Sequence, residues 1–373
     1  MTGFLGAFGL LAAIVAFIVA HEAGHFFAAK ATGMKVTEFF LGFGPKIWSF
    51  KRGETEYGIK PIPFGAYVRI VGMSALEEVA PEDVGRTYRE KEFWKKSVVV
   101  LAGVAANFLL AYLLLFGLAM WGGDQTPTTA VREVVVPDDG SESAARLAGI
   151  EAGDVILSVD GVASGDWESL AAAIGSRPGE TVVIEIDRRG SILSLPATLG
   201  SRSDPVTGEN VGFLGVAPDY ERQPISVFSG AGRAARLVGI QVAGTVDVFS
   251  KIFRFDTLSQ LFGGVLGGEV DNAVRPVSPI GLAQIGSQAG ELGIINLLGV
   301  MAAVNVTLGT VNAVPLFPLD GGHFAVALYE KLTRRKVDVR ALIPVAVIVI
   351  GALSILGVVS IILDIVNPIQ IPS

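Results

Sequence analysis

Two histidines and a glutamate fall within five residues of this sequence, in the stretch HEAGH from His21 to His25. In a helix, His21 and His25 stand one turn apart on the same face, so their imidazoles can bind one metal ion. The pattern is typical of zinc peptidases, in which the metal lowers the pKa of a bound water and a glutamate, here Glu22, accepts its proton. The spacing therefore predicts a hydrolytic zinc site.

The residues around this motif are apolar. Phe4 to Ala20 contain no charged residue, and Phe4 to Ala31 is long enough to cross a hydrocarbon core as a helix. Ionisable groups in a spanning helix are costly and mark a functional site by default. The alternative is a metal-free triad hydrogen-bonded inside a helix bundle, which is disfavoured because burying such groups without a metal costs free energy.

Composition indicates an integral membrane protein with a soluble insert. The 373 residues are 51% hydrophobic and 17% charged, with a mean hydropathy of +0.55. The net charge of −7 and the lack of a basic tract argue against a nucleic-acid partner. Cysteine is absent, which excludes disulfides and thiolate ligands. The first apolar stretch lacks a basic start and a small-residue cleavage site, which indicates an uncleaved span.

Three more spans are predicted, at Ser97 to Trp121, Gly293 to Asn312 and Ala341 to Leu363. In the first of these, Gly103 and Asn107 share a helical face, where the glycine permits close helix approach and the amide can bond across the bundle.

The third span runs into NAVPLFPLDGGH, Asn312 to His323. Pro315 and Pro318 break the helix, which is tolerated at membrane depth only where the freed backbone is buried in protein or lines a cavity. Asp320 follows the break and is a candidate ligand or relay; the alternative is a simple helix cap.

Between the first two spans, residues 36–72 read as a β-region. Short β-like runs at Val36 to Leu41, Lys46 to Lys51, Glu54 to Lys60 and Ala66 to Val71 are separated by turn residues and are rich in aromatic residues. We expect a β-hairpin sheet that dips into the membrane interface. The alternative is a cytoplasmic β-loop whose aromatic side chains pack together.

The insert runs from Thr126 to Gln223. Its string AARLAGIEAGDVILSVDGVA, Ala144 to Ala163, resembles a bacterial PDZ domain, a fold that takes an extended peptide as an added strand. A spacer or plug without peptide binding is the alternative. An amphipathic helix at Ile225 to Phe253 and a flexible glycine-rich connector at Phe262 to Gly268 should follow.

The basic residues predict the topology. They gather before the second span and between the last two spans, which places both loops in the cytoplasm: Lys30, Lys35, Lys46, Lys51, Arg52 and Lys60, then Lys331, Arg334, Arg335, Lys336 and Arg340. Both termini and the insert would then be extracytoplasmic in a multi-pass protein of the cell's inner (plasma) membrane.

The predicted fold is an α-helical polytopic membrane protein with four transmembrane helices, a membrane-associated β-hairpin sheet and an inserted α+β PDZ-like domain. The expected parts are a first half of a membrane core at 1–125, the PDZ-like domain at 126–223, the amphipathic helix and connector at 224–292, and the second half of the core at 293–373.

HEAGH, the Gly103 and Asn107 pair, the PDZ-like insert and N-x-x-P-x-x-x-L-D-G at Asn312 to Gly321 occur together in this chain. In this combination the chain resembles the site-2 protease family of intramembrane zinc metalloproteases, in the bacterial branch that includes the regulator of sigma-E protease. The resemblance covers nearly the whole chain. One PDZ-like unit is present where the best-known member has two, so a two-domain substrate filter cannot be assumed.

The resemblance implies that His21, His25 and Asp320 bind Zn²⁺ and that Glu22 is the general base. It also implies that Asn312 and Asn107 hold the substrate backbone or the developing oxyanion, a role that amide donors can fill. On spacing alone, His323 is a rival third ligand.

The implied activity is hydrolysis of peptide bonds within or near the spanning segments of single-span membrane proteins, such as anti-sigma factors or signal-peptide remnants. A non-catalytic membrane scaffold or adaptor with a structural zinc is the first alternative. A metal transporter is the second, but it should carry histidines and acids along facing helices.

Overall fold

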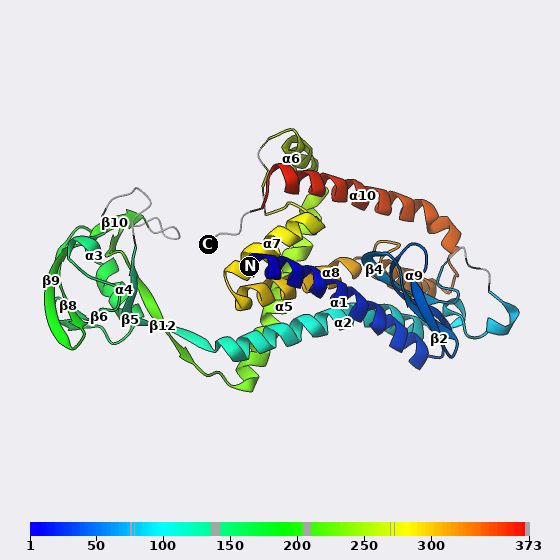
Figure 1. Ribbon diagram of the computed structural model, residues 1–373, viewed down its shortest axis with the longest axis horizontal. Helices are drawn as coiled ribbons and strands as arrows, with labels where there is room; N and C mark the ends of the chain where they lie inside the picture. Colours follow the sequence, from blue (N-terminus) through cyan, green and yellow to red (C-terminus); the bar gives the residue numbers. More distant parts are fainter. Residues whose placement is uncertain are drawn as a thin grey trace. The chain divides into compact units, whose positions relative to one another are not determined.

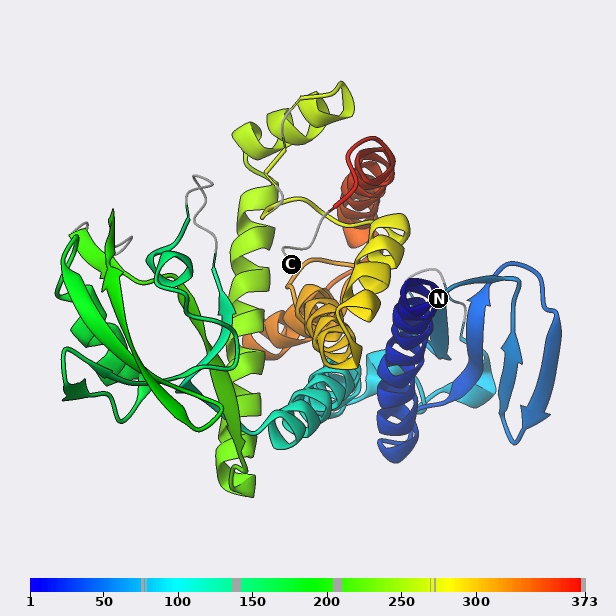
Figure 2. The same cartoon turned by 60° about the vertical axis from the view of Figure 1, so that its left-hand side comes forward.

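The computed structural model describes residues 1–74, 77, 79–135, 142–203, 210–268, 270–271 and 273–369. The chain divides into two compact units, whose elements are shown in Figures 1 and 2. One unit is formed by Met1–Ala119 and Val227–Ser373, and the other by Met120–Ser226.

The first unit is built on long apolar helices. α1 (Thr2–Ala31), α2 (Phe93–Gly122), α8 (Ile294–Asn312) and the segment Arg340–Val366, which contains α10 (Ile343–Val366), are each long and apolar enough to cross a membrane. The four predicted spans are thus confirmed as helices of this kind. A short helix, α9 (Asp320–Thr333), connects α8 to a turn at Val339–Leu342 before α10.

A four-stranded sheet lies in the chain between α1 and α2. Its strands are β1 (Val36–Phe43), β2 (Trp48–Arg52), β3 (Thr55–Ile59) and β4 (Ile62–Ile70), in the order β2-β3-β1-β4. β1 is parallel to β3 and antiparallel to β4, so the sheet is mixed and not a simple series of hairpins. β4 is an edge strand, and short turns at Pro81–Asp83 and Tyr88–Glu90 lead from it to α2.

A helix that the sequence pattern did not reveal, α7 (Pro279–Glu291), packs against the first half of α1 (Figures 1 and 2). Glycines make this approach possible. A Cβ atom on Gly6 would collide with the carbonyl oxygen of Gly286, and one on Gly290 would meet the Gly6 backbone. The backbones therefore touch where larger residues would hold the helices apart.

A buried ion pair fixes α7 to the end of α10. The Nη2 atom of Arg275 lies 2.6 Å from Asp364 Oδ1, and both side chains are fully buried. The other carboxylate oxygen accepts a hydrogen bond from the backbone N–H of Ser278 at 2.8 Å, at the N-terminus of α7. A carboxylate is favoured there because free amides and the helix dipole face it.

The predicted connector at Phe262 to Gly268 is wrong in its first part. After α5 (Val227–Ile252), the helix α6 (Phe255–Val265) includes residues 262–265. Leu261 is buried with Leu356, Val359 and Leu363 of α10. A Cβ on Gly264 would meet the side chain of Leu363, so this glycine permits close helix packing that outweighs its low helix propensity.

The second unit is an α+β domain. Its main sheet has the order β12-β5-β6-β8-β9, with a short strand β7 paired to β6, and a separate hairpin pairs β10 with β11. Two helices, α3 and α4, complete it. The bounds are β5 Asp124–Val134, α3 Ala144–Leu147, β6 Val155–Val159, β7 Val162–Ala163, α4 Trp167–Gly175, β8 Thr181–Arg188, β9 Ser191–Thr198, β10 Gly200–Ser203, β11 Asn210–Phe213 and β12 Val216–Gln223.

An arginine clamps the turn before β6 to β8 in this unit. Arg188 donates to both carboxylate oxygens of Asp154, each at 2.8 Å, and the Asp154 residue is 1% exposed. These bonds hold the pKa of Asp154 below its ordinary value.

This pair predicts a pH dependence of stability in the second unit. Because the pKa of Asp154 is lower in the folded state, its contribution is fully present above the unfolded pKa of about 3.9 and is lost as the pH falls through the folded pKa. Asp154→Asn should lower the melting temperature at pH 7 and flatten its dependence between about pH 5 and pH 2. Thermal denaturation of the full chain, followed in the second unit's strands, measures this. An unchanged acid dependence in the variant would contradict it.

Candidate active site

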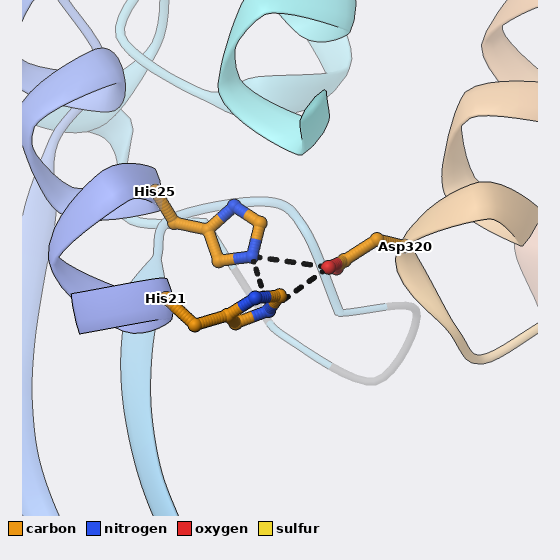
Figure 3. Close-up of side chains that lie close together, drawn as sticks. All are labelled: His21, His25 and Asp320. Atoms are coloured by element: carbon orange, nitrogen blue, oxygen red, sulfur yellow. Dashed lines mark hydrogen bonds and ion pairs between the residues drawn. The ribbon is translucent and has the colours of Figure 1, made fainter. Parts of the chain in front are cut away.

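The first span and the short helix α9, which follows the third span, supply the polar groups of the site. His21 and His25 lie one turn apart on α1, and Asp320 is the first residue of α9, directly after the broken segment that follows α8. Glycines let α9 fold back on that segment: a Cβ on Gly321 would collide with the Ala313 carbonyl oxygen, and one on Gly322 with the Phe317 backbone. Figure 3 shows the three side chains pointing toward one another from the two helices.

Three donor atoms converge at this point. Asp320 Oδ2 lies 3.0 Å from His21 Nε2 and 3.2 Å from His25 Nε2, and the two imidazole nitrogens are 3.1 Å apart. Among the described residues, these three side chains are the group of histidines and acids able to hold a metal ion. Ligands about 2 Å from a tetrahedral zinc ion lie about 3.3 Å from one another, so the separations suit zinc.

The protonation state of His25 shows why a cation fits here. Its Nδ1 lies 2.8 Å from the carbonyl oxygen of Val99 on α2. A carbonyl only accepts, so Nδ1 carries a proton, and in the neutral imidazole that binds metals Nε2 presents a lone pair to the centre. Asp320 Oδ2 is buried there without a hydrogen-bond donor. Buried lone pairs facing one another are unfavourable unless a cation lies between them.

Asn107 of α2 performs the corresponding role for His21. The fully buried side-chain amide lies 3.3 Å from His21 Nδ1. If the amide turns so that its oxygen, which has no hydrogen-bond donor among the described residues, faces Nδ1, the imidazole donates from Nδ1 and leaves Nε2 free. Thus α2 contacts the outer nitrogen of both imidazoles.

Close packing between α1 and α2 keeps these contacts short. A Cβ on Gly103 would collide with His25 Nε2 and lie 2.9 Å from His21 Cε1. A Cβ on Gly24 would likewise strike the Ala102 carbonyl oxygen. Only glycine at both positions lets the histidines lie against the α2 backbone.

Glu22 lies beside this centre, half-buried, and its carboxylate interacts with the backbone amide of Val68 on the edge strand β4. It is thus placed between the imidazoles and the edge of the sheet. The arrangement offers two imidazoles, a carboxylate and an adjacent second carboxylate that makes none of the close contacts at the centre. That is the donor set of a hydrolytic zinc site with one position left for water.

Comparison with known proteins decides the family. The model of peptidase family M50 matches residues 9–357. The chain belongs to peptidase family M50. It is 33% identical to zinc metalloprotease Rip1 of Mycolicibacterium smegmatis, over 96% of this chain and 97% of that protein. It is 30% identical to Rip1 of Mycobacterium tuberculosis, over 96% of each. Identity to zinc metalloprotease RasP of Shouchella clausii is 28%, over 88% of this chain and 92% of that protein.

The resemblance to the site-2 proteases is therefore confirmed. This M50 chain is a zinc metallopeptidase, its cofactor is Zn²⁺, and as a membrane protein of this family it acts on membrane-protein substrates within the bilayer.

The other candidate residues of this M50 peptidase occupy different places. His323, the rival ligand, lies one turn beyond Asp320, outside the donor group, with its ring 4.9 Å from that of Phe317. Asn312 ends α8, half-buried, and its amide forms no hydrogen bond with another described residue. It is therefore available to a ligand in a way that Asn107 is not.

Sequence reasoning missed Asn305. This fully buried residue of α8 donates its amide to the backbone carbonyl of Asn107 at 2.9 Å and so ties α8 to the part of α2 that contacts His21. A signal was present, because an asparagine inside an apolar span should seek a partner across the bundle.

Proposed function

We propose that this M50 peptidase cleaves single-span membrane proteins within or near their spanning segment, with Zn²⁺ held by His21, His25 and Asp320. The observation that supports this most is the convergence of three buried donor atoms from two separate helices, next to Glu22, inside a bundle of apolar helices. Anti-sigma factors and signal-peptide remnants are the substrate classes we propose, since both are single-span proteins.

Each residue has a role in this chemistry. Zinc, when bound, supplies a Lewis acid that activates water and polarises the scissile carbonyl. Glu22 accepts the proton of the attacking water and later returns it to the leaving amine. The free amide of Asn312 holds the substrate backbone or the developing oxyanion. Asn107 orients His21. Because of this contact, Asn107 is less able to touch the substrate than the resemblance to the site-2 proteases implied.

Glu22→Gln separates this proposal from a scaffold with a structural zinc. The substitution keeps the shape and hydrogen bonding of the side chain but removes the base, so cleavage should fall by at least about a hundredfold. Zinc content should stay at the wild-type level, because Glu22 is not a ligand. The measurement is cleavage of a single-span substrate in proteoliposomes, with zinc determined by elemental analysis. Unchanged cleavage would favour the scaffold, and joint loss of zinc would make Glu22 a ligand.

A groove next to the metal centre can receive the substrate. It has a volume of about 650 Å³ and lies between the edge strand β4 and α10, with the Phe317–Pro318 turn between them. Its walls are mostly apolar, as an unwound spanning segment requires. They include Val68, Ile70, Met73, Ile343, Ala346, Val347 and Ile350.

Substrate binding along β4 follows from the exposed strand edge. A spanning helix hides its scissile carbonyls in its own hydrogen bonds, so it must be unwound locally before attack. The Val71 N–H, directly after β4, donates to the backbone carbonyl of Lys35, directly before β1, whereas the Val68 amide interacts with Glu22. Since amides alternate along a strand, Ala66 and Val68 face away from β1. We infer that the unwound segment adds to this edge as a fifth strand.

Ala66→Pro tests this pairing. Proline removes one N–H that faces away from β1 and leaves the bonds to β1, so cleavage should fall about tenfold or more while the zinc content stays normal. Ala66→Ser keeps the N–H and is the matched control. Cleavage by the proline variant at the control rate would reject strand addition.

The membrane placement of the sheet is also part of the proposal. Ile47 and Trp48 are 66% and 58% exposed, beside Lys46 and Lys51, a combination suited to a membrane interface. Basic loops support cytoplasmic placement of this sheet, and extracytoplasmic placement of both termini and the second unit, in the inner membrane. Because the chain has no cysteine, labelling of a single introduced cysteine in intact cells tests each assignment. Labelling at Arg335 from outside would contradict the topology.

The second unit is proposed to be a PDZ-like domain that controls access. A cavity of about 660 Å³ is lined by Trp167 and Ile174 of α4 and by the segment Gly212–Pro218, as in a groove for an extended peptide. We propose that the domain excludes substrates with bulky ectodomains. Deletion of residues 126–223 should then allow cleavage of untrimmed substrate. Loss of all cleavage would show recruitment instead.

A further inference from the structure

A second, smaller cavity adjoins the proposed substrate groove. It has a volume of about 140 Å³ and is bounded by α9, the first turn of α2 and the segment between β4 and α2. Met73, Phe317 and His323 line both this cavity and the groove. The cavity is therefore a side pocket next to the path proposed for the substrate.

The register of α9 places this pocket near the metal centre. Asp320 begins the helix, and His323, Ala327 and Glu330 follow at intervals of three and four, which puts them on one face. That face forms one wall of the pocket. A helical turn rises only about 5.4 Å, so a group in the pocket lies one to three turns from the aspartate.

Among the fully buried side-chain oxygen and nitrogen atoms of the described residues that line this pocket, the Tyr88 hydroxyl is the one without a hydrogen-bond partner. Tyr88 is 7% exposed, and its hydroxyl has no hydrogen-bond partner among the described residues. Lys96 and Glu330, which also line the pocket, are paired with each other, with Lys96 Nζ 2.9 Å from Glu330 Oε2. The other oxygen of Glu330 accepts from the Val337 N–H at 3.1 Å. A buried hydroxyl left unpaired costs free energy, so a ligand that bonds to it gains affinity and selectivity.

We propose that this pocket is a specificity subsite that accepts an aromatic side chain adjacent to the scissile bond, with tyrosine preferred. Its size supports a ring, since a protein cavity of about 150 Å³ binds benzene. Phe317, Met73 and Val326 supply apolar walls, and the Tyr88 hydroxyl bonds to the hydroxyl of the incoming tyrosine.

The subsite rests on the proposed function. A substrate strand along β4 directs alternate side chains to opposite faces, so every second one faces the groove wall made by Phe317 and His323. On that face, the substrate side chain nearest the attacked carbonyl lies next to the pocket and can enter it. Arg89 and Lys336 also line the cavity, which disfavours a cationic side chain there.

The test uses the full-length protein in proteoliposomes and a panel of single-span model substrates with Tyr, Phe, Leu, Ala or Lys at either residue of the scissile bond, located by mass spectrometry. At one of the two positions the wild type should cleave the Tyr substrate with the highest kcat/KM and the Lys substrate with the lowest. Tyr88→Phe should reduce the ratio of kcat/KM for Tyr over Phe by about tenfold. Ala327→Leu fills the pocket and should reduce kcat/KM for both aromatic substrates at least about tenfold relative to Ala.

Ala325→Leu is the matched control, because it adds the same side chain to α9 outside the pocket lining and should leave the preferences unchanged. If Ala327→Leu lowers kcat/KM equally for every substrate of the panel, the pocket is a path for water or product, and the subsite is rejected. A wild type without aromatic preference, or an unchanged Tyr to Phe ratio in Tyr88→Phe, would also overturn it. Absence of zinc-dependent cleavage of every panel member would instead reject the proposed function, and the subsite with it.

Discussion

Mutual repulsion of buried lone pairs is the constraint around which this membrane unit is arranged. Two imidazole nitrogens and a carboxylate oxygen lie within 3.2 Å of one another, and the Val99 carbonyl holds the proton of a neutral His25 on Nδ1, away from this centre. Such a cluster favours a cation at its centre, and a metal ion bound there would join α1 to α9. Zinc bound there would couple metal binding to the folding of this unit, because the three donors come from segments nearly 300 residues apart along the chain.

The rest of the unit keeps this cluster in place while leaving one side open. α2 contacts both imidazoles through Val99 and Asn107, and α8 holds Asn107 through Asn305. On the opposite side, the helix α8 ends in a turn, and β4 is the edge strand of its sheet. The close packing of α2 and α8 fixes the histidines, whereas the turn after α8 and the edge strand β4 leave backbone accessible at the groove. This combination suits the proposed cleavage of a locally unwound substrate.

Several features of the structure could be predicted from local patterns in the sequence. The helical spacing of His21 and His25, the lengths of the apolar spans and the strands of the β-region all depend on short-range periodicity, and the structure has them as helices and strands. The pairing of β1 with β3 in parallel, the helix α7 and the extent of α6 depend on tertiary contacts. Gly264 illustrates the difference, because a glycine that reads as a breaker in isolation serves as a packing surface against Leu363. Tyr88 and Asn305 were missed for the same reason, since their importance comes from neighbours distant in sequence.

We expect Asp320, and not His323, to complete the metal site with the two histidines. X-ray absorption at the zinc edge of the purified full-length protein tests it directly. We expect two imidazole nitrogens and carboxylate or water oxygens at about 2.0–2.2 Å from the zinc, a shell that changes in Asp320→Ala and is preserved in His323→Ala. Three imidazoles in the shell, the reverse response of the two variants, or protein purified without metal would contradict it.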